Sequence, residues 1–233
     1  MILELAQVQI HTRTDTCESR NGFCPSWIVD HFGDYVDPFF QHLWLTVVTV
    51  VIGFAISFTL ALVAYRRRWL VNPVTQVTGI LYTIPSVAAF FLLLPVTGRG
   101  TDTALIALVS YVLLIIFRNV LAGLDNVPAE TKDAGRGMGL TDNQLLWRVE
   151  VPLALPEIMA GLRIATTTTV GLATLAFFAG AGGLGDKIFS DITYKSNVVV
   201  AGGLAVLMAA TLDGLILLTQ KAITPWTRTV GQP

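Results

Sequence analysis

Long apolar segments are the feature that most constrains what this chain can fold into. Residues 43–65 contain no charged side chain. As a helix rising about 1.5 Å per residue they would extend about 34 Å, enough to cross the hydrocarbon core of a bilayer. The other candidate segments are 74–94, 103–124, 158–178 and 198–218. Because polar backbone groups inside a bilayer must be satisfied within the protein, we expect an all-α integral membrane protein with five transmembrane helices.

The composition agrees with a membrane-spanning chain. Hydrophobic residues make up 53% of the 233 residues and charged residues only 13%, whereas soluble domains carry about 25% charged residues. The formal net charge of −1 gives no reason to expect a nucleic-acid partner. The length suits one domain, and we see no internal repeat of the kind that builds secondary transporters.

The positions of the basic residues predict the orientation in the membrane. Arg66, Arg67 and Arg68 directly follow the first apolar segment, and cytoplasmic loops are enriched in such residues. We therefore expect the N-terminus outside and the C-terminus inside, in a multi-pass protein of the plasma membrane. The expected regions are an extracytoplasmic segment at 1–42, a transmembrane domain at 43–220 with a cytoplasmic loop at 128–156, and a cytoplasmic tail at 221–233.

The segment before the first apolar stretch is polar and lacks the features of a signal peptide. Ile28, Val29 and Phe32 recur with rough helical spacing, which predicts a short amphipathic helix on the membrane surface; a disordered tail is the alternative. Cys17 and Cys24 are the two cysteines of the chain. Outside the cell they would form a disulfide, and two free thiols are the alternative. Two such ligands are too few to predict a metal site.

One polar, basic stretch lies between the third and fourth apolar segments. Pro128 suits a first helical position, and the glycines at 135, 137 and 139 weaken the helix that it starts. Thr141 followed by Gln144 has the pattern of a capping box, which restarts a helix. Pro152 is expected to end that helix, because proline lacks the N–H that a continuing helix needs. We therefore predict two short helices joined by a turn and facing water.

This loop resembles the signature of the membrane subunits of bacterial ABC importers. That signature reads Glu-Ala-Ala, three residues, Gly, nine residues, then Ile-x-Leu-Pro. The matching positions here are Asp133, Ala134, Gly135, Gly139, Val149, Val151 and Pro152. The flanking runs R-G-M-G, V-P-L-A-L-P-E-I-M-A-G-L-R and A-G-A-G-G-L-G resemble the branch that carries the osmoprotectants glycine betaine, choline and carnitine.

The resemblance implies a permease subunit with partners. In such permeases the loop is the coupling helix, which sits in a groove of a separate ATPase subunit. The residues expected at that contact are Asp133, Ala134, Gly135, Gly139, Leu140, Thr141, Asp142, Leu145, Val149 and Pro152. A second permease subunit, either another copy or a paralogue, and an extracytoplasmic substrate-binding protein are implied as well. The sequence alone leaves amino acids or other small polar solutes as an alternative cargo.

Two positions depart from the signature. Asp133 stands where the family has Glu and is one methylene shorter. Gly135 stands where the family has Ala, which should weaken the first helix by about 1 kcal/mol. Both departures suggest a looser or a specialised contact with the ATPase.

The sequence carries no motif for chemistry of its own. It has no Gly-x-x-x-x-Gly-Lys-Ser/Thr loop for ATP, no His-Glu-x-x-His and no Gly-x-Ser-x-Gly with a partnered histidine. We therefore expect no enzyme and no bound cofactor, with ATP and magnesium held by the partner subunit. A stand-alone channel or secondary carrier is the alternative of a different class. It would need paired charges within the membrane, and Asp213 is the candidate that we considered for one.

Five residues are candidates for lining a translocation path. They are Tyr82, Pro85, Thr167, Phe177 and Asp213. Aromatic faces attract quaternary ammonium groups, but packing between helices or contact with lipid is the alternative for each ring. Pro85 predicts a kink that either serves packing or shapes the path, and the threonine run at 166–169 either joins helices or lines the path. For Asp213 a structural ion pair with Arg118 or Arg163 is the favoured alternative.

Overall fold

The computed structural model describes Cys17 and residues 22–228, and every regular element in that part of the chain is a helix. The longer α-helices are α2 (Val36–Arg66), α3 (Val71–Thr83), α4 (Ser86–Thr97), α5 (Thr101–Asp125), α8 (Val151–Ala173) and α10 (Lys195–Ile223). The shorter ones are α1 (Pro25–His31), α6 (Ala129–Gly137), α7 (Asp142–Leu145) and α9 (Leu184–Ser190). Four 3₁₀ turns, η1 (Phe32–Tyr35), η2 (Arg68–Leu70), η4 (Ala176–Ala179) and η5 (Pro225–Arg228), and a π-helical turn, η3 (Leu146–Glu150), connect or follow them.

Three stretches of the described chain are long and apolar enough to cross a membrane: Pro25–Arg66, Thr101–Asp125 and Lys195–Ile223. The helices η2–α3 and α4 are each too short to cross alone; together they are long and apolar enough, with a bend of 97° between them. The predicted kink at Pro85 is therefore a full break, with Ile84 in extended conformation between the two helices. The predicted segment 158–178 corresponds to α8 and η4, but α8 does not meet the apolarity criterion, since it carries Glu157, Arg163 and a run of threonines.

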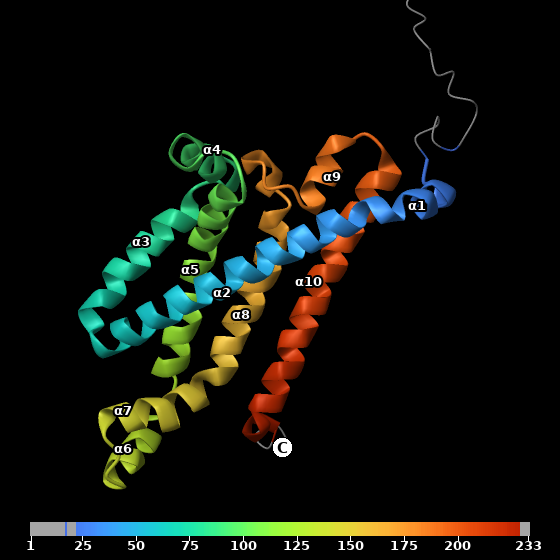
Figure 1. Cartoon of the computed structure of the whole chain (residues 1–233). Coiled ribbons are helices and arrows are strands. Elements are labelled where there is room, and N and C mark those ends of the chain that lie inside the picture. Colours follow the sequence, from blue (N-terminus) through green and yellow to red (C-terminus); the bar gives the residue numbers. More distant parts are fainter. Residues whose placement is uncertain (1–16, 18–21, 229–233) are drawn as a thin grey trace, which may run out of the picture.

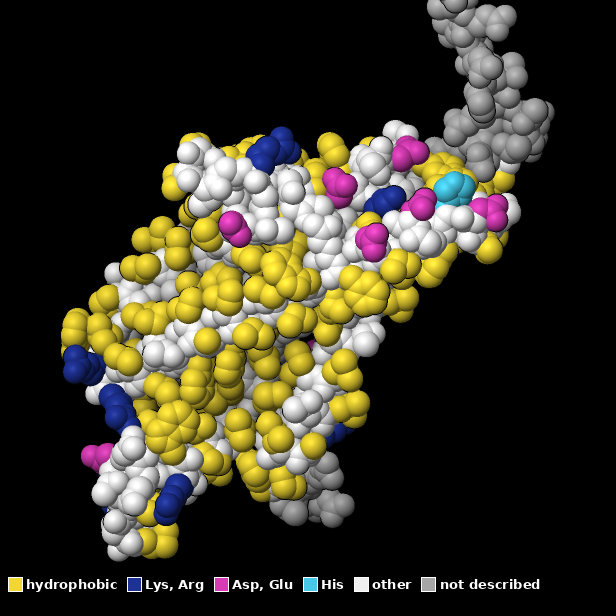
Figure 2. All heavy atoms as spheres, viewed as in Figure 1, with side chains coloured by type: hydrophobic (Ala, Val, Ile, Leu, Met, Phe, Trp, Pro, Cys, Tyr) yellow, Lys and Arg dark blue, Asp and Glu magenta, His cyan; other side chains and the backbone are white. Residues whose placement is uncertain are grey.

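Helix α5 lies at the centre of the bundle, in contact with α2, α3, α4 and α8. Figure 1 shows α2 crossing both α5 and α8. Small residues permit the close approaches: a Cβ on Gly53 would overlap the side chain of Val112, and a Cβ on Gly161 would overlap Asn119. The core around these contacts is apolar, with Phe117 and Leu124 fully buried. Figure 2 shows hydrophobic side chains across the middle of one face and charged side chains gathered toward its two ends.

The last long helix, α10, packs against α8 and α9 and holds the N-terminal part of the described chain. The backbone N–H of Cys24 donates to Ser196 Oγ at 2.9 Å, and the Tyr35 hydroxyl donates to Asn197 Oδ1 at 2.7 Å. The Trp27 ring meets the Tyr194 ring edge-on. The sulfur atoms of Cys17 and Cys24 are bonded, at 2.02 Å. The rest of the predicted N-terminal segment, 1–16 and 18–21, lies outside the described residues.

A glycine-rich connection links α8 to α9. Gly180, Gly182 and Gly183 adopt positive φ, a backbone conformation open mainly to glycine. Gln41 Nε2 donates to the Ala181 carbonyl at 2.5 Å and so fixes this connection against α2. This connection leads directly into α9, which begins at Leu184.

Candidate functional site

The polar stretch between α5 and α8 folds into α6, α7 and η3 at one end of the bundle (Figure 1). Pro128 is the N-cap of α6 and not its first helical residue, one position earlier than predicted. The capping box before α7 is formed: Thr141 Oγ1 accepts from the Gln144 backbone N–H at 3.4 Å, and Gln144 Oε1 accepts from the Thr141 N–H at 2.9 Å. The predicted restart of the helix at this point is therefore confirmed.

Two glycines of the loop have different structural roles. Gly139 makes the turn between α6 and α7 with φ of 82°, and a Cβ there would meet nothing within 4 Å. Within this chain its requirement is therefore conformational and not one of space. Gly135 is buried, and a Cβ on it would come to 2.6 Å from Leu145 Cδ1. This glycine, predicted to weaken the first helix and to lie at the ATPase contact, lets α6 and α7 pack together.

The prediction that Pro152 ends the second helix of the loop is wrong. The chain runs on from α7 through η3 into α8, and Pro152 stands in the first turn of α8. Proline is tolerated there because the first N–H groups of a helix have no partner within it. The wider π turn at η3 precedes it, and such turns often occur at functional sites. The second helix of the loop therefore continues directly into α8.

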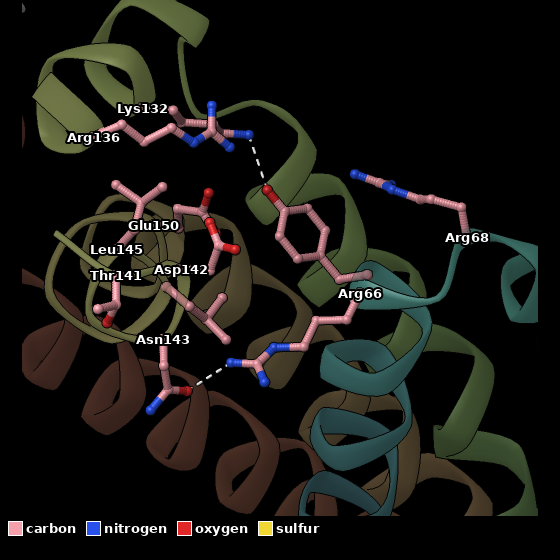
Figure 3. Close-up of a pocket in the computed structure, with 11 residues that line it drawn as sticks. Arg66, Arg68, Lys132, Arg136, Thr141, Asp142, Asn143, Leu145 and Glu150 are labelled. Carbon is pink, nitrogen blue, oxygen red and sulfur yellow. Dashed lines mark hydrogen bonds between the residues drawn. The ribbon is translucent and has the colours of Figure 1, made fainter. Parts of the chain in front are cut away.

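A hollow of about 840 Å³ opens between this loop and the end of α2. It is lined by Tyr65, Arg66, Arg68, Lys132, Arg136, Thr141, Asp142, Asn143, Leu145, Leu146 and Glu150 (Figure 3). Lys132 Nζ donates to the Tyr65 hydroxyl at 2.9 Å and to the Leu124 carbonyl at 3.3 Å. Arg66 donates to Asn143 Oδ1 at 2.6 Å. These contacts fasten α6 and α7 to the end of α2.

The hollow is charged on both sides. Its cations are Arg66, Arg68, Lys132 and Arg136, and its acids are Asp142 and Glu150. Glu150 is buried in the wall. The neighbouring ion pairs, Arg68–Asp125 at 2.7 Å and Arg136–Asp133 at 3.2 Å, are largely exposed and contribute under about 1 kcal/mol each. Arginine side chains with such weak partners remain available to a docked protein.

The predicted contact residues fall into two groups. Asp133, Ala134, Gly139, Thr141 and Asp142 are exposed on the loop. Gly135 and Leu145 are buried, and Leu140, Val149 and Pro152 are half-buried. These five therefore contribute more to the packing of the loop than to its exposed surface.

Two large exposed side chains were missed by the sequence reasoning. Met138 is 76% exposed and Trp147 is 50% exposed. Apolar side chains on an otherwise polar loop were the available signal, because such residues commonly form contacts between proteins.

The predicted path residues do not form one cluster. Tyr82, on α3, meets the ring of Tyr111, whose hydroxyl donates to the carbonyl of Ile84 beside the break at Pro85. Phe177, in η4, stacks instead with Phe189. Of the neighbouring rings, Phe90 is fully buried, whereas the rings of Phe91 and Phe178 lie 5.7 Å apart.

Thr167 and Asp213 are both hydrogen-bonded to Arg163. Arg163 Nε donates to Asp213 Oδ1 at 2.7 Å and its Nη2 to Oδ2 at 2.8 Å, which joins α8 to α10. Thr167 Oγ1 donates to the Arg163 carbonyl one turn earlier. Of the two arginines considered as partners for Asp213, the structure selects Arg163.

The fold and the loop define a helical membrane protein of the transporter class. The chain belongs to the family of binding-protein-dependent transport system inner membrane components, whose family model matches residues 53–226. It is therefore a multi-pass protein of the plasma membrane and a permease of the ABC importer type.

Individual relatives agree with this family. The chain is 37% identical to the osmoprotectant import permease protein OsmW of Salmonella typhimurium over 206 residues, 85% of this chain and 96% of that protein. It is 34% identical to the glycine betaine/carnitine/choline transport system permease protein OpuCB of Bacillus subtilis over 187 residues, 79% of this chain and 86% of that protein. Its fold is similar to inward-facing conformations of the MetNI methionine ABC transporter, with a TM-score of 0.69, 26% identity and coverage of 85% and 96%.

Proposed function

We propose that this chain is the permease subunit of an ABC importer for osmoprotectants with a quaternary ammonium group, such as glycine betaine, choline or carnitine. The observation that carries the proposal is the similarity to OsmW and OpuCB over most of their length. The partners are an ATPase subunit that holds ATP and magnesium, a second permease subunit and an extracytoplasmic binding protein. This chain itself catalyses no reaction and holds no cofactor.

The test is reconstitution of the chain with these partners in vesicles. ATP-dependent uptake of labelled glycine betaine, choline and carnitine is measured, with methionine as the comparison solute. We expect uptake of at least one quaternary ammonium solute and none of methionine. Uptake of methionine alone would support the second candidate, an amino-acid importer, which the similarity to MetNI favours.

The loop formed by α6, α7 and η3 is the surface at which we place the ATPase. Its polar face, its exposed Met138 and its fastening to α2 through Tyr65 and Arg66 suit a rigid knob that transmits movement. Because α7 continues into α8, a displacement of the knob moves a long bundle helix directly. Cross-linking of a cysteine at Met138 to the ATPase, compared with a cysteine at Phe189 near the other end of the bundle, tests this placement. Equal cross-linking at both positions contradicts it.

We further propose five crossings, made by α2, the bent pair α3–α4, α5, α8 and α10, with the N-terminus outside. The less apolar α8 would then be shielded from lipid by other helices. A tag at the N-terminus should be labelled by an impermeant reagent on intact cells that lack an outer-membrane barrier, and a tag at the C-terminus only after lysis. The reverse labelling pattern contradicts the orientation.

A further inference from the structure

Arg163 on α8 and Asp213 on α10 form a bidentate ion pair within the bundle, outside the loop formed by α6, α7 and η3. Asp213 lies five residues before Leu218, where the apolar run ends, which is about 8 Å along the helix axis. That is about a quarter of the thickness of the hydrocarbon core. Charges at such a depth are costly, so they are paired and commonly mark a solute or ion pathway. The two side chains are nevertheless 31% and 30% exposed in the single chain.

The face of α8 that carries Arg163 is polar and only partly covered. Thr167, Gly171 and Thr174 follow at spacings of three or four residues, which places them on the same side of the helix. None of the four is buried by the described chain, and a Cβ on Gly171 would meet nothing within 4 Å. A helix face in contact with lipid would be apolar. This face therefore borders water, a solute or another polypeptide.

The hydroxyl groups on this face are already satisfied. Thr167 Oγ1 donates to the Arg163 carbonyl, and Thr174 Oγ1 donates to the Gly171 carbonyl. A quaternary ammonium group has no N–H to donate and needs no new acceptor. Such a lining lets this group pass without breaking hydrogen bonds, and it leaves the ion pair as the place where charge is recognised.

We propose that Arg163 and Asp213 form a subsite for zwitterionic solutes that carry a carboxylate and a quaternary ammonium group; this inference rests on the proposed function. The guanidinium takes the solute carboxylate in the bidentate geometry that it now offers to Asp213. The freed Asp213 carboxylate faces the quaternary ammonium group. Both protein charges stay paired during the exchange, so no isolated charge is left within the membrane.

The same geometry discriminates between solutes. Choline has the ammonium group but no carboxylate, so pairing it with Asp213 leaves Arg163 without a counter-ion. The subsite therefore favours glycine betaine and carnitine over choline. Lysine at position 163 would keep the charge but lose the planar fork, and should give an intermediate result.

The experiment measures direct binding to the assembled permease–ATPase complex in nanodiscs, without the binding protein. Saturation-transfer NMR of the trimethylammonium protons reports affinity for glycine betaine and for choline. We expect wild-type affinity for glycine betaine to exceed that for choline about tenfold, and Arg163→Gln/Asp213→Asn to lower the affinity for glycine betaine about tenfold or more. Thr211→Val is the matched control on α10, since the Thr211 hydroxyl bonds only to its own helix, at the Leu207 carbonyl, and it should bind as wild type does.

Neutralising both partners leaves no unpaired charge, so this double variant should assemble, and its amount in the purified complex is measured first. Should it not assemble, Arg163→Lys replaces it, with an expected loss of about threefold or more. Equal affinity of the wild type for the two solutes, no signal with glycine betaine, or unchanged binding in the variant that assembles each overturns the subsite.

Uptake by the complete importer separates this inference from the proposed function. A wild type that imports none of the quaternary ammonium solutes overturns both. A wild type that imports glycine betaine, together with a double variant that imports it equally well, overturns only the subsite.

Discussion

Lys132, in α6, donates a hydrogen bond to the hydroxyl group of Tyr65 at the end of α2, across 2.9 Å. The guanidinium carbon of Arg68 lies over the same ring, 4.5 Å from the ring centroid. Lys132 Nζ also lies over this ring, 5.5 Å from its centroid, so one aromatic side chain fixes the polar loop to the bundle with a hydroxyl group and a ring face.

Removing the Tyr65 hydroxyl group should loosen the loop. Tyr65→Phe keeps the ring but loses the hydrogen bond to Lys132, and should cost about 1 kcal/mol. Tyr65→Ala also loses the ring and should cost more. Trypsin cleavage after Lys132 and Arg136 in the purified protein measures the opening of the loop, and we expect about fivefold faster cleavage for Tyr65→Phe. Cleavage at the wild-type rate would show that the contact does not hold the loop.

The turn at Gly139 should be sensitive to any side chain, however small. Gly139→Ala places a Cβ on a residue with φ of 82°, which costs about 1–2 kcal/mol. Gly137→Ala is the matched control, because it also has open space around the new Cβ but lies in α6. We expect weaker binding of the ATPase and poorer coupling of ATP hydrolysis to uptake for Gly139→Ala only. Equal behaviour of the two variants would contradict the conformational argument.

Gly135 should be sensitive to size. Alanine meets only the flexible end of Leu145, at 2.6 Å, and its higher helix propensity offsets part of that contact. Gly135→Leu has no room and should separate α6 from α7 at a cost of about 2 kcal/mol. Gly137→Leu faces open space and provides the comparison. Thermal unfolding in detergent and tryptic cleavage of the loop should rank the variants as Gly137→Leu, Gly135→Ala and Gly135→Leu, from most to least stable.

Ser196 should hold the N-terminal segment against α10. Its hydroxyl group accepts from the Cys24 N–H at 2.9 Å and donates to the Gly22 carbonyl at 3.1 Å. Ser196→Ala leaves both backbone groups without a side-chain partner and should cost about 1–3 kcal/mol locally. Hydrogen exchange of residues 22–35 should be faster in this variant than in Ser190→Ala, whose hydroxyl group bonds only within α9. Identical exchange in the two variants would contradict the anchor.

The thiol content of the chain should follow from the Cys17–Cys24 bond. Protein purified without reductant should have no thiol group that reacts with maleimide. After unfolding and reduction it should have two reactive thiol groups. Since the only two cysteines are these, the count is unambiguous. Two reactive thiols before reduction would contradict both the disulfide and the oxidising location proposed for the N-terminus.

Local patterns predicted much of this fold. The uncharged run at 43–65 became α2, the run at 198–218 became α10, and the break at Pro85 appeared where a proline interrupts an apolar segment. The capping box formed because its two partners are only three residues apart, so no distant part of the chain decides it. Helix ends differed by several residues, since apolarity marks the part inside the bilayer and not the turns beyond it.

Relationships between distant residues were not predictable in the same way. Nothing in the sequence around Lys132 names Tyr65 as its partner, and the role of Gly135 depends on where Leu145 is brought by the turn. Pro152 was misjudged because a proline after a helix and a proline opening the next one look alike in sequence; the π turn that joins α7 to α8 decides between them. For Asp213 two arginines were candidate partners from the sequence, and the packing of α8 on α10 selected Arg163.

The attachment of the N-terminal segment to α10 has a consequence for biogenesis. Cys24 and Tyr35 leave the ribosome early, whereas their partners Ser196 and Asn197 are made more than 160 residues later. Through nearly all of translation the segment has no docking surface, and in the proposed orientation its cysteines can meet oxidant before α10 exists. The segment therefore docks late, because this end of the bundle closes only after α10 has been synthesised.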